Sequence, residues 1–375
     1  MSFEIKAING KARAGILKLP HGEIETPVFM PIGTVGSVKG IMWNDLKNII
    51  KAQIILANTY HLYLRPGTDI LYEAGGLHKF LNWERPILSD SGGYQVYSLA
   101  NIRKINVEGV EFRSHLDGSK HFFTPEKVME IQQYIGSDIM MAFDECTPHP
   151  ADYEYAKKSL ELTQKWLVKC IEYLETHPAK YDFPQYLFPI VQGSTYTDLR
   201  EKAANFVSQF DTLGYAIGGL SVGEPAEIMY EMIKIVNNIL PENKPRYLMG
   251  VGTPENILQA VALGVDMFDC VIPTRNGRNG QLFTTEGIIN IKNEKWRHDF
   301  SPIDIQSPLE IDHTTTKSYL RHLFQAGEML GPMIASYHNL AFYIRLMQEI
   351  RYHIIKGDYD KYYPIAIETY MMKRL

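Results

Sequence analysis

The chain has 375 residues, of which 45% are hydrophobic and 22% charged, and its formal net charge is −5. This length can bury a sizeable core, and the composition is typical of a soluble globular protein. The negative net charge argues against a general binder of polyanions, although it leaves room for a local basic patch.

Targeting and membrane signals are absent from the sequence. The N-terminal residues have no apolar run of signal-peptide length, and no later stretch approaches the roughly 20 apolar residues of a membrane span. The three cysteines, Cys146, Cys170 and Cys270, are widely spaced and form no CxxC motif. Reduced thiols in a reducing compartment fit this pattern best. We therefore expect a cytoplasmic protein that does not bind a membrane.

The first part of the chain predicts a small sheet followed by a barrel. Apolar and polar residues alternate over 1–26 around Asn9-Gly10 and His21-Gly22, which predicts an N-terminal antiparallel sheet. From Pro27 onward, short apolar runs alternate with helical stretches. The runs span 27–34, 53–59, 86–92, 138–145, 186–193, 215–221, 246–252 and 265–271. Such strands predict a parallel sheet, and eight repeats predict a closed (β/α)8 TIM barrel over 27–285.

The remaining segments read as additions to this α/β barrel. The segment at about 97–120 predicts a hairpin inserted between the third and fourth strands. After the eighth strand, 287–296 predicts one more hairpin, and the spacing over 317–356 is fully helical. We expect 286–375 to form a C-terminal hairpin and helical subdomain that packs on the barrel.

Polar groups follow the apolar runs at the ends where a barrel carries its chemistry. Asp90, Asp144 and Asp269 lie near the ends of the third, fourth and eighth runs. Like charges crowded in a partly desolvated pocket raise at least one pKa, so one carboxyl can act as an acid while another stays ionised. This suits displacement at an acetal-type carbon, with one carboxylate attacking and another moving protons. For each aspartate alone, a helix N-cap is the alternative.

The eighth run carries two aspartates with different expected positions. Asp266 and Asp269 lie three residues apart, so a strand points them to opposite faces. Asp269 is the better candidate for the site, because it is next to a predicted loop over 274–278 that carries Arg275 and Arg278.

Other strand ends predict a pocket for a flat, polar ligand. Glycine pairs follow the third, sixth and seventh runs and would let such a ligand touch the backbone. Tyr94 offers an aromatic face, and Asp144, Gln192 and the Gly219 amide offer hydrogen bonds to the edge of a purine. The segment GVGTPEN over 250–256 is typical of a phosphate-gripping loop before a helix. Taken singly, Tyr94 also fits a core aromatic and Gln192 a satisfied loop residue.

Six ordered blocks carry a family resemblance. They are SDSGGYQ (89–95), AFDECTP (142–148), VQGS (191–194), AIGGLSVGE (216–224), YLMGVGTPENI (247–257) and MFDCVIPTRNGRNG (267–280). Together they resemble the bacterial tRNA-guanine transglycosylases of the queuosine pathway, from about Phe3 to the C-terminal helices. The resemblance implies exchange of guanine at the wobble position (G34) of GUN-anticodon tRNAs for a 7-deazaguanine, through a covalent enzyme–tRNA intermediate and without a redox cofactor.

The same resemblance implies a role for each matching residue. Asp269 would be the nucleophile that attacks the ribose C1′, Asp90 the general acid and base, and Tyr94 the group that stacks on the base. The other residues implied in base binding are Ser91, Gly92, Gly93, Asp144, Cys146, Gln192, Gly219, Leu220, Val222 and Met249. The residues implied in holding the anticodon stretch are Gly250, Val251, Gly252, Thr253, Pro254, Glu255, Asn256, Thr274, Arg275, Asn276, Gly277 and Arg278.

Two features refine this expectation. Val222 and Cys146 match the bacterial pattern, so we expect 7-aminomethyl-7-deazaguanine as the incoming base. The family holds a structural zinc with three cysteines and a histidine, and it works as a homodimer. Here the cysteine positions fall on Ser307, Leu309 and Asp312, while His338 keeps the histidine. Leu309 can supply no ligand, so we expect no zinc, although Asp312 and His313 leave open a metal held with His338.

Two other functions remain open. A non-catalytic tRNA-binding partner subunit would have no need of Asp90 and Asp269, and a barrel hydrolase acting on a small glycoside would suit the carboxylates alone. A set of basic residues near the expected mouth favours a polyanionic substrate instead: Arg275, Arg278, Lys292, Lys295 and Arg297.

Overall fold

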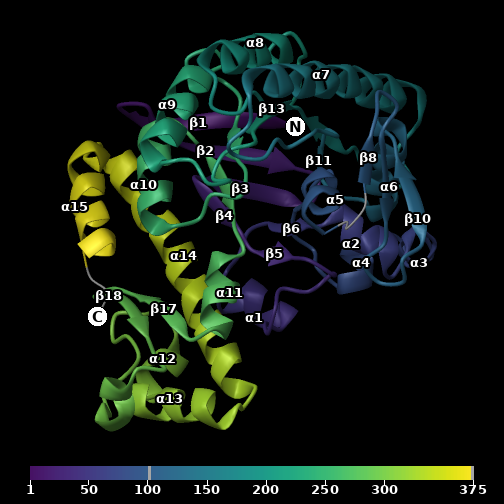
Figure 1. Ribbon diagram of the computed structural model, residues 1–375. Coiled ribbons are helices and arrows are strands. Elements are labelled where there is room, and N and C mark those ends of the chain that lie inside the picture. The colour runs from purple at the N-terminus through teal and green to yellow at the C-terminus, as the bar shows by residue number, and fades with distance from the viewer. Residues whose placement is uncertain (100–102, 373–375) are drawn as a thin grey trace.

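The computed structural model describes residues 1–99 and 103–372, and a ring of parallel strands lies at its centre (Figure 1). One run of paired strands consists of β5 (Ile32–Gly33), β6 (Ile55–Ala57), β7 (Ile87–Ser89), β11 (Ile139–Met141) and β12 (Tyr186–Phe188). The other consists of β13 (Ile190–Val191), β14 (Tyr215–Ile217), β15 (Arg246–Leu248), β16 (Met267–Asp269) and β4 (Val28–Met30).

Two prolines divide this ring without opening it. Pro31 separates β4 from β5, and Pro189 separates β12 from β13, because proline has no N–H for a strand ladder. The neighbouring strands bridge both interruptions: Leu56 N donates to Pro31 O at 2.9 Å, and Ala216 N donates to Pro189 O at 2.9 Å. The two runs therefore join into one closed parallel barrel, which confirms the predicted fold class.

A three-stranded antiparallel sheet covers the N-terminal end of the barrel. It consists of β1 (Ser2–Asn9), β2 (Ala12–Leu19) and β3 (Gly22–Thr26). Leu17, Leu19 and Ile24 from this sheet belong to the same buried cluster as barrel side chains such as Met141 and Met267. Because apolar side chains close this end, the opposite end, where the strands terminate, is the one left for chemistry.

Helices alternate with the strands around the barrel. The short ones are α1 (Trp43–Asn48), α2 (Thr59–Leu64), α3 (Thr68–Glu73), α4 (Leu77–Leu81) and α5 (Gly93–Leu99). The longer ones are α6 (Pro125–Ile135), α7 (Tyr153–Thr176), α8 (Thr197–Val207), α9 (Ala226–Asn237) and α10 (Pro254–Ala262). Helix α7 begins after Asp152, whose side chain accepts the Tyr155 N–H at 2.9 Å as an N-cap.

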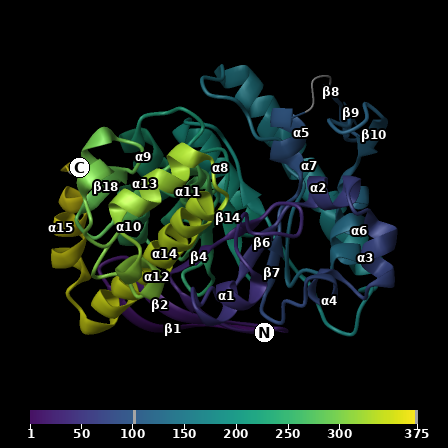
Figure 2. The ribbon, with the colours of Figure 1, turned by 90° about the horizontal axis from the view of Figure 1, so that it is seen from below.

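The inserted segment and the C-terminal region lie on opposite sides of the barrel, as Figure 2 shows from below. The insertion has three antiparallel strands rather than a simple hairpin: β8 (Arg103–Ile105), β9 (Val110–Arg113) and β10 (Lys120–Phe123). The C-terminal helices are η1 (Glu294–His298, a 3-10 helix), α12 (Glu310–Thr314), α13 (Lys317–Ala326), α14 (Leu330–Lys356) and α15 (Tyr359–Met372). Helix α14 packs on β1, β2 and β4 and so ties this region to the barrel.

Two sequence predictions were wrong after the eighth strand. The hairpin consists of β17 (Gln281–Thr284) and β18 (Gly287–Asn290) and does not reach 296. The predicted loop over 274–278 is part of helix α11 (Ile272–Arg278), which begins with Pro273 in its first turn. Gly277 is not a turn residue: a Cβ there would lie 2.8 Å from Ala335 O of α14. The glycine therefore serves close packing between two helices.

The proposed division of the chain at residues 26 and 285 remains a prediction. Among the described residues, no helix is long and apolar enough to cross a membrane.

Candidate active site at the mouth of the barrel

Three buried aspartates of the described chain lie at one end of the barrel. Asp90 directly follows β7, Asp144 lies three residues beyond β11, and Asp269 is the last residue of β16. Their exposed fractions are 8%, 7% and 7%. Since the strands are parallel, all three belong to the edge opposite the N-terminal sheet.

Asp90 accepts four hydrogen bonds, all from neutral groups. Its Oδ1 accepts from Thr59 N at 2.8 Å and Gly92 N at 3.1 Å, and its Oδ2 accepts from Asn58 Nδ2 at 2.5 Å and Gln95 Nε2 at 2.9 Å. Burial raises the pKa of Asp90 to about 6, and these hydrogen bonds limit the rise. A carboxyl with this pKa can hold or release a proton near neutral pH.

Asp269 has one occupied and one open oxygen. Tyr247 Oη donates to Oδ1 at 2.6 Å and Gly250 N donates to the same atom at 2.7 Å. No described residue hydrogen-bonds Oδ2. Burial raises the pKa of Asp269, while the two hydrogen bonds act in the opposite direction. The carboxylate is held in a fixed orientation with Oδ2 able to meet a ligand.

Asp144 and Gln192 form the polar wall of the pocket. Ser91 Oγ donates to Asp144 Oδ1 at 3.0 Å, and Gln192 Nε2 donates to Asp144 Oδ2 at 2.7 Å. Burial raises the pKa of Asp144 to about 6. Gln192 Oε1 is buried without a partner in the described part of the chain, so it is a candidate acceptor for a ligand N–H.

Only glycine fits at position 219, because the backbone there lies very close to the Gln192 side chain. Gly219 has a φ of 64°, and a Cβ there would lie 2.2 Å from Gln192 Oε1. Any side chain would therefore displace the amide of Gln192.

The other residues implied in base binding differ in exposure. Tyr94 of α5 is 54% exposed and Leu220 is 3% exposed, while Cys146, Val222 and Met249 are half-buried. Burial raises the pKa of the Cys146 thiol to about 12, so this cysteine stays protonated and is unsuited to be a nucleophile. A small cavity next to Asp144 is lined by Gly93, Val96, Ile105, Val110, Asp144, Glu145, Cys146 and Trp166.

The segments expected to hold RNA combine exposed and buried positions. Arg275 and Arg278 of α11 are exposed, as is Gly250. Burial and the nearby Arg275 charge lower the pKa of Arg278, so the two cations lie close together. Gly252 allows close packing of its backbone against Cys270, because a Cβ at Gly252 would lie 2.1 Å from Cys270 Cβ. The buried members are Val251, Gly252, Pro254, Thr274 and Gly277, and the half-buried ones are Thr253, Glu255, Asn256 and Asn276.

Sequence reasoning missed three residues that build the site. Asn58 and Gln95 bond Asp90, and Tyr247 bonds Asp269. Asn58 had a signal, because a polar residue at the end of an apolar run is unusual. Tyr247 had none, because an aromatic residue within a strand is usually a core residue.

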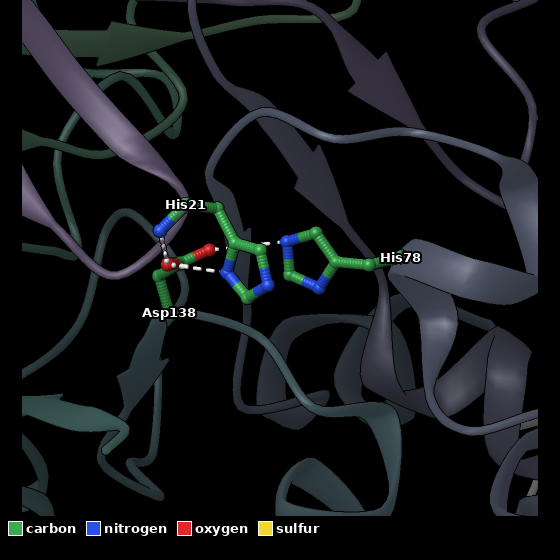
Figure 3. Close-up of side chains that lie close together, drawn as sticks. All are labelled: His21, His78 and Asp138. Carbon is green, nitrogen blue, oxygen red and sulfur yellow. Dashed lines mark hydrogen bonds and ion pairs between the residues drawn. The ribbon is translucent and has the colours of Figure 1, made fainter. Parts of the chain in front are cut away.

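One group among the described residues could hold a metal ion, and it consists of His21, His78 and Asp138 (Figure 3). It lies at the end of the barrel opposite the mouth, because Asp138 comes directly before β11. Asp138 precedes β11 and accepts from His21 Nδ1 at 2.9 Å, while His78 Nε2 is 3.2 Å from its other oxygen. Backbone N–H groups of His21 and Ile87 also donate to the two oxygens. The imidazole rings stack with centroids 3.6 Å apart. We interpret this group as a clamp between the N-terminal sheet, the barrel and α4.

The positions expected to bind zinc in the family do not fit a metal here. Leu309 is 1% exposed and offers no ligand atom. His338 uses both ring nitrogens: Nδ1 is 2.8 Å from Asp312 Oδ2, and Nε2 is 2.7 Å from Phe283 O. Burial disfavours the charged imidazole, but the Asp312 carboxylate and the Phe283 carbonyl, with a smaller contribution from Asp304, together outweigh the effect of burial and raise the pKa of His338. A buried ion pair therefore lies where the family would have its zinc.

The fold and the site define an α/β-barrel protein with buried carboxylates and a set of hydrogen-bonding groups at its mouth. The family model described as queuine tRNA-ribosyltransferase matches residues 9–371. A queuine tRNA-ribosyltransferase of Caldanaerobacter subterraneus is 57% identical over 91% of this chain and 89% of its own length. The relative from Aquifex aeolicus, with the same name, is 54% identical over 99% and 98%. The chain belongs to the queuine tRNA-ribosyltransferase family, which confirms the resemblance drawn from the sequence.

Proposed function

We propose that this protein is a tRNA-guanine transglycosylase. It exchanges guanine at the wobble position of GUN-anticodon tRNAs for a 7-deazaguanine, and 7-aminomethyl-7-deazaguanine is the incoming base we expect. The observation that carries the proposal is the state of Asp269: Tyr247 and Gly250 fix its Oδ1, and its Oδ2 is open at the mouth. Family membership over nearly the whole chain supports the same reaction.

The carboxylates divide the chemistry between them. Asp269 Oδ2 attacks the ribose C1′, forming an ester-like C–O bond as the C1′–N9 bond to guanine breaks. The leaving guanine takes up a proton, which Asp90 supplies, since its pKa of about 6 leaves a protonated fraction near neutral pH. N9 of the incoming base then attacks C1′, its proton passes to Asp90, and the Asp269 carboxylate is released.

Base recognition uses the polar wall. The guanine edge presents N–H donors to the Asp144 carboxylate and an O6 acceptor to amide N–H groups. Gln192 and the backbone at Gly219 and Leu220 supply the remaining polar atoms, and Tyr94 stacks on the base. The half-buried Val222 restricts space for a large substituent, a filter worth about 1 to 3 kcal/mol, and so favours the aminomethyl base.

The RNA is held by charge and by the shape of a single-stranded loop. Arg275 and Arg278 are exposed on α11, directly after the strand that carries Asp269. Phosphate contacts from such arginines position the anticodon stretch, while the splayed-out wobble base enters the pocket.

The C-terminal region functions without zinc in this proposal. The Asp312–His338 pair joins α12 and α14, and the bond to Phe283 O adds β17, so one network connects three elements. Metal analysis of the purified protein should find far less than one zinc per chain, and EDTA should leave the melting temperature unchanged. One tightly bound zinc per chain would refute this part. We also propose a homodimer located in the cytoplasm, where its tRNA substrate lies.

Radiolabelled guanine exchange into tRNA tests the function. The protein should incorporate labelled guanine into a GUN-anticodon tRNA and not into one lacking the wobble guanine. Unlabelled 7-aminomethyl-7-deazaguanine should compete more strongly than queuine. Tight tRNA binding without any exchange would instead identify a non-catalytic partner subunit.

A further inference from the structure

The buried Arg200 of α8 has no role in the chemistry described above, and its surroundings are unusual for an arginine. Its exposed fraction is 0%, and no described carboxylate forms an ion pair with it. Burial lowers its pKa to about 10, so it keeps its charge at neutral pH. A buried cation without an anionic partner is costly unless its N–H groups are satisfied.

Backbone carbonyls of two strand-end loops satisfy this guanidinium. Nε donates to Ser194 O at 2.7 Å, and Nη1 donates to Val191 O at 3.0 Å and Gly218 O at 2.8 Å. Nη2 donates to Gly219 O at 3.1 Å. One side chain therefore joins the loop after β13 to the loop after β14, the two loops that carry Gln192 and Gly219.

These contacts fix the direction of two peptide groups. In a planar trans peptide, the C=O of one residue and the N–H of the next point in opposite directions. Because Arg200 binds the carbonyls of Gly218 and Gly219, the N–H groups of Gly219 and Leu220 point away from it. No described group accepts a hydrogen bond from either N–H. The loop after β14 thus presents, beside Gln192, a pair of donors that have no partner in the described part of the chain.

The loop after β13 also contains strain that Arg200 offsets. Ser194 has a φ of 51°, a conformation that non-glycine residues seldom adopt, and its carbonyl is the one bound by Nε.

We propose that Arg200 is a positioning residue for base recognition: its guanidinium holds the two strand-end loops in the shape that presents the Gly219 and Leu220 N–H groups and the Gln192 amide to a carbonyl-bearing base. This inference rests on the proposed function. Arg200 touches no substrate and acts through the loops.

Steady-state exchange kinetics of Arg200→Lys test the proposal. Lysine keeps the charge but cannot reach four carbonyls at once. We expect the KM for guanine to rise on the order of tenfold or more, with the Kd for tRNA within about twofold, since tRNA affinity comes mostly from phosphate contacts. Arg246→Lys is the matched control, because Arg246 is also buried, at 5% exposure, but is the first residue of β15, at the far end of the barrel. It should lower the melting temperature and leave the KM for guanine unchanged.

Two outcomes separate this inference from the function on which it rests. Wild-type activity with an unchanged KM in Arg200→Lys would overturn the positioning role alone, whereas a wild type without exchange would overturn the function. If Arg200→Lys does not fold, amide hydrogen exchange of the wild-type protein takes the place of the kinetic test. The amides of Gly219 and Leu220 should exchange fast and become protected by guanine, and protection already present without guanine would contradict the proposal.

Discussion

Six buried aspartates of this protein form two sets that differ in their partners. Those at the mouth accept hydrogen bonds from neutral donors alone: Asp90, Asp144 and Asp269. Three buried aspartates elsewhere each lie against a basic side chain: Asp266 with Arg13, Asp138 with His21 and His78, and Asp312 with His338. Burial is similar in both sets, so a basic partner is what separates these three structural aspartates from the three at the mouth.

A single strand illustrates the difference. Asp266 precedes β16 and Asp269 ends it, and both are buried. Arg13 binds both oxygens of Asp266, whereas the described residues donate to Oδ1 of Asp269 and not to its Oδ2. Burial still raises the pKa of Asp266, although the Arg13 charge acts against the rise. The paired carboxylate anchors the N-terminal sheet to the barrel, and the unpaired one remains reactive.

Replacing each aspartate of this strand should produce opposite failures. Asp269→Asn should reduce guanine exchange by about 10³-fold or more, because it removes the oxygen that we propose attacks the ribose, with little change in the free energy of unfolding. Asp266→Asn should cost about 3 to 5 kcal/mol of stability by leaving the Arg13 charge buried without its partner. Exchange assays and urea unfolding measure the two effects. Equal losses of activity and stability in both variants would remove the distinction between the sets.

The Asp312–His338 pair extends the structural set to the C-terminal region. Asp312→Asn should lower the free energy of unfolding by about 3 kcal/mol, because it leaves His338 buried with a weaker partner. The KM for guanine should stay at the wild-type value in the folded variant. Denaturant unfolding with and without zinc provides the measurement, and a variant as stable as the wild type would contradict the structural role.

The mouth set should leave a signature in the pH dependence of stability. The pKa of Asp144 is about 6 in the folded protein, above its unfolded value, so the native state binds this proton more tightly. Its contribution to stability therefore falls as pH rises from about 4 to about 6 and stays low above that range. Asp144→Asn should remove this fall, gaining on the order of 1 to 3 kcal/mol at pH 7 relative to the wild type. Melting curves from pH 4 to 8 test this, and Asp211→Asn, at an exposed position, is the control. Identical pH profiles of stability for the wild type and Asp144→Asn would argue against a raised pKa of Asp144.

The smallest effects should come from the arginines beside the mouth. Arg275→Ala and Arg278→Ala should each weaken tRNA binding by about threefold to tenfold. Each should also reduce the slope of the logarithm of tRNA affinity against the logarithm of salt concentration by about one, without changing the KM for guanine. Filter binding at several salt concentrations measures both quantities. An unchanged salt slope would place these arginines outside the RNA contact.

The sequence predicted the parts of the molecule that depend on local pattern. Apolar runs located the barrel strands, and their polar ends located Asp90, Asp144 and Asp269. It failed where distant chain segments decide the structure. Gly277 suggested a turn, but close packing between α11 and α14 requires it within a helix. The roles of Tyr247 and Arg200 depend on partners that only the folded barrel brings together.

We propose that Asp269 attacks the ribose because no basic side chain of the described residues pairs with it. Incubation with a GUN-anticodon tRNA, followed by denaturing gel electrophoresis, tests this most directly. The wild type should form a protein–tRNA band that survives denaturation and disappears when free guanine is added in excess. The band should be absent in Asp269→Asn and present in Asp211→Asn. A band of wild-type intensity in Asp269→Asn would show that another residue is the nucleophile.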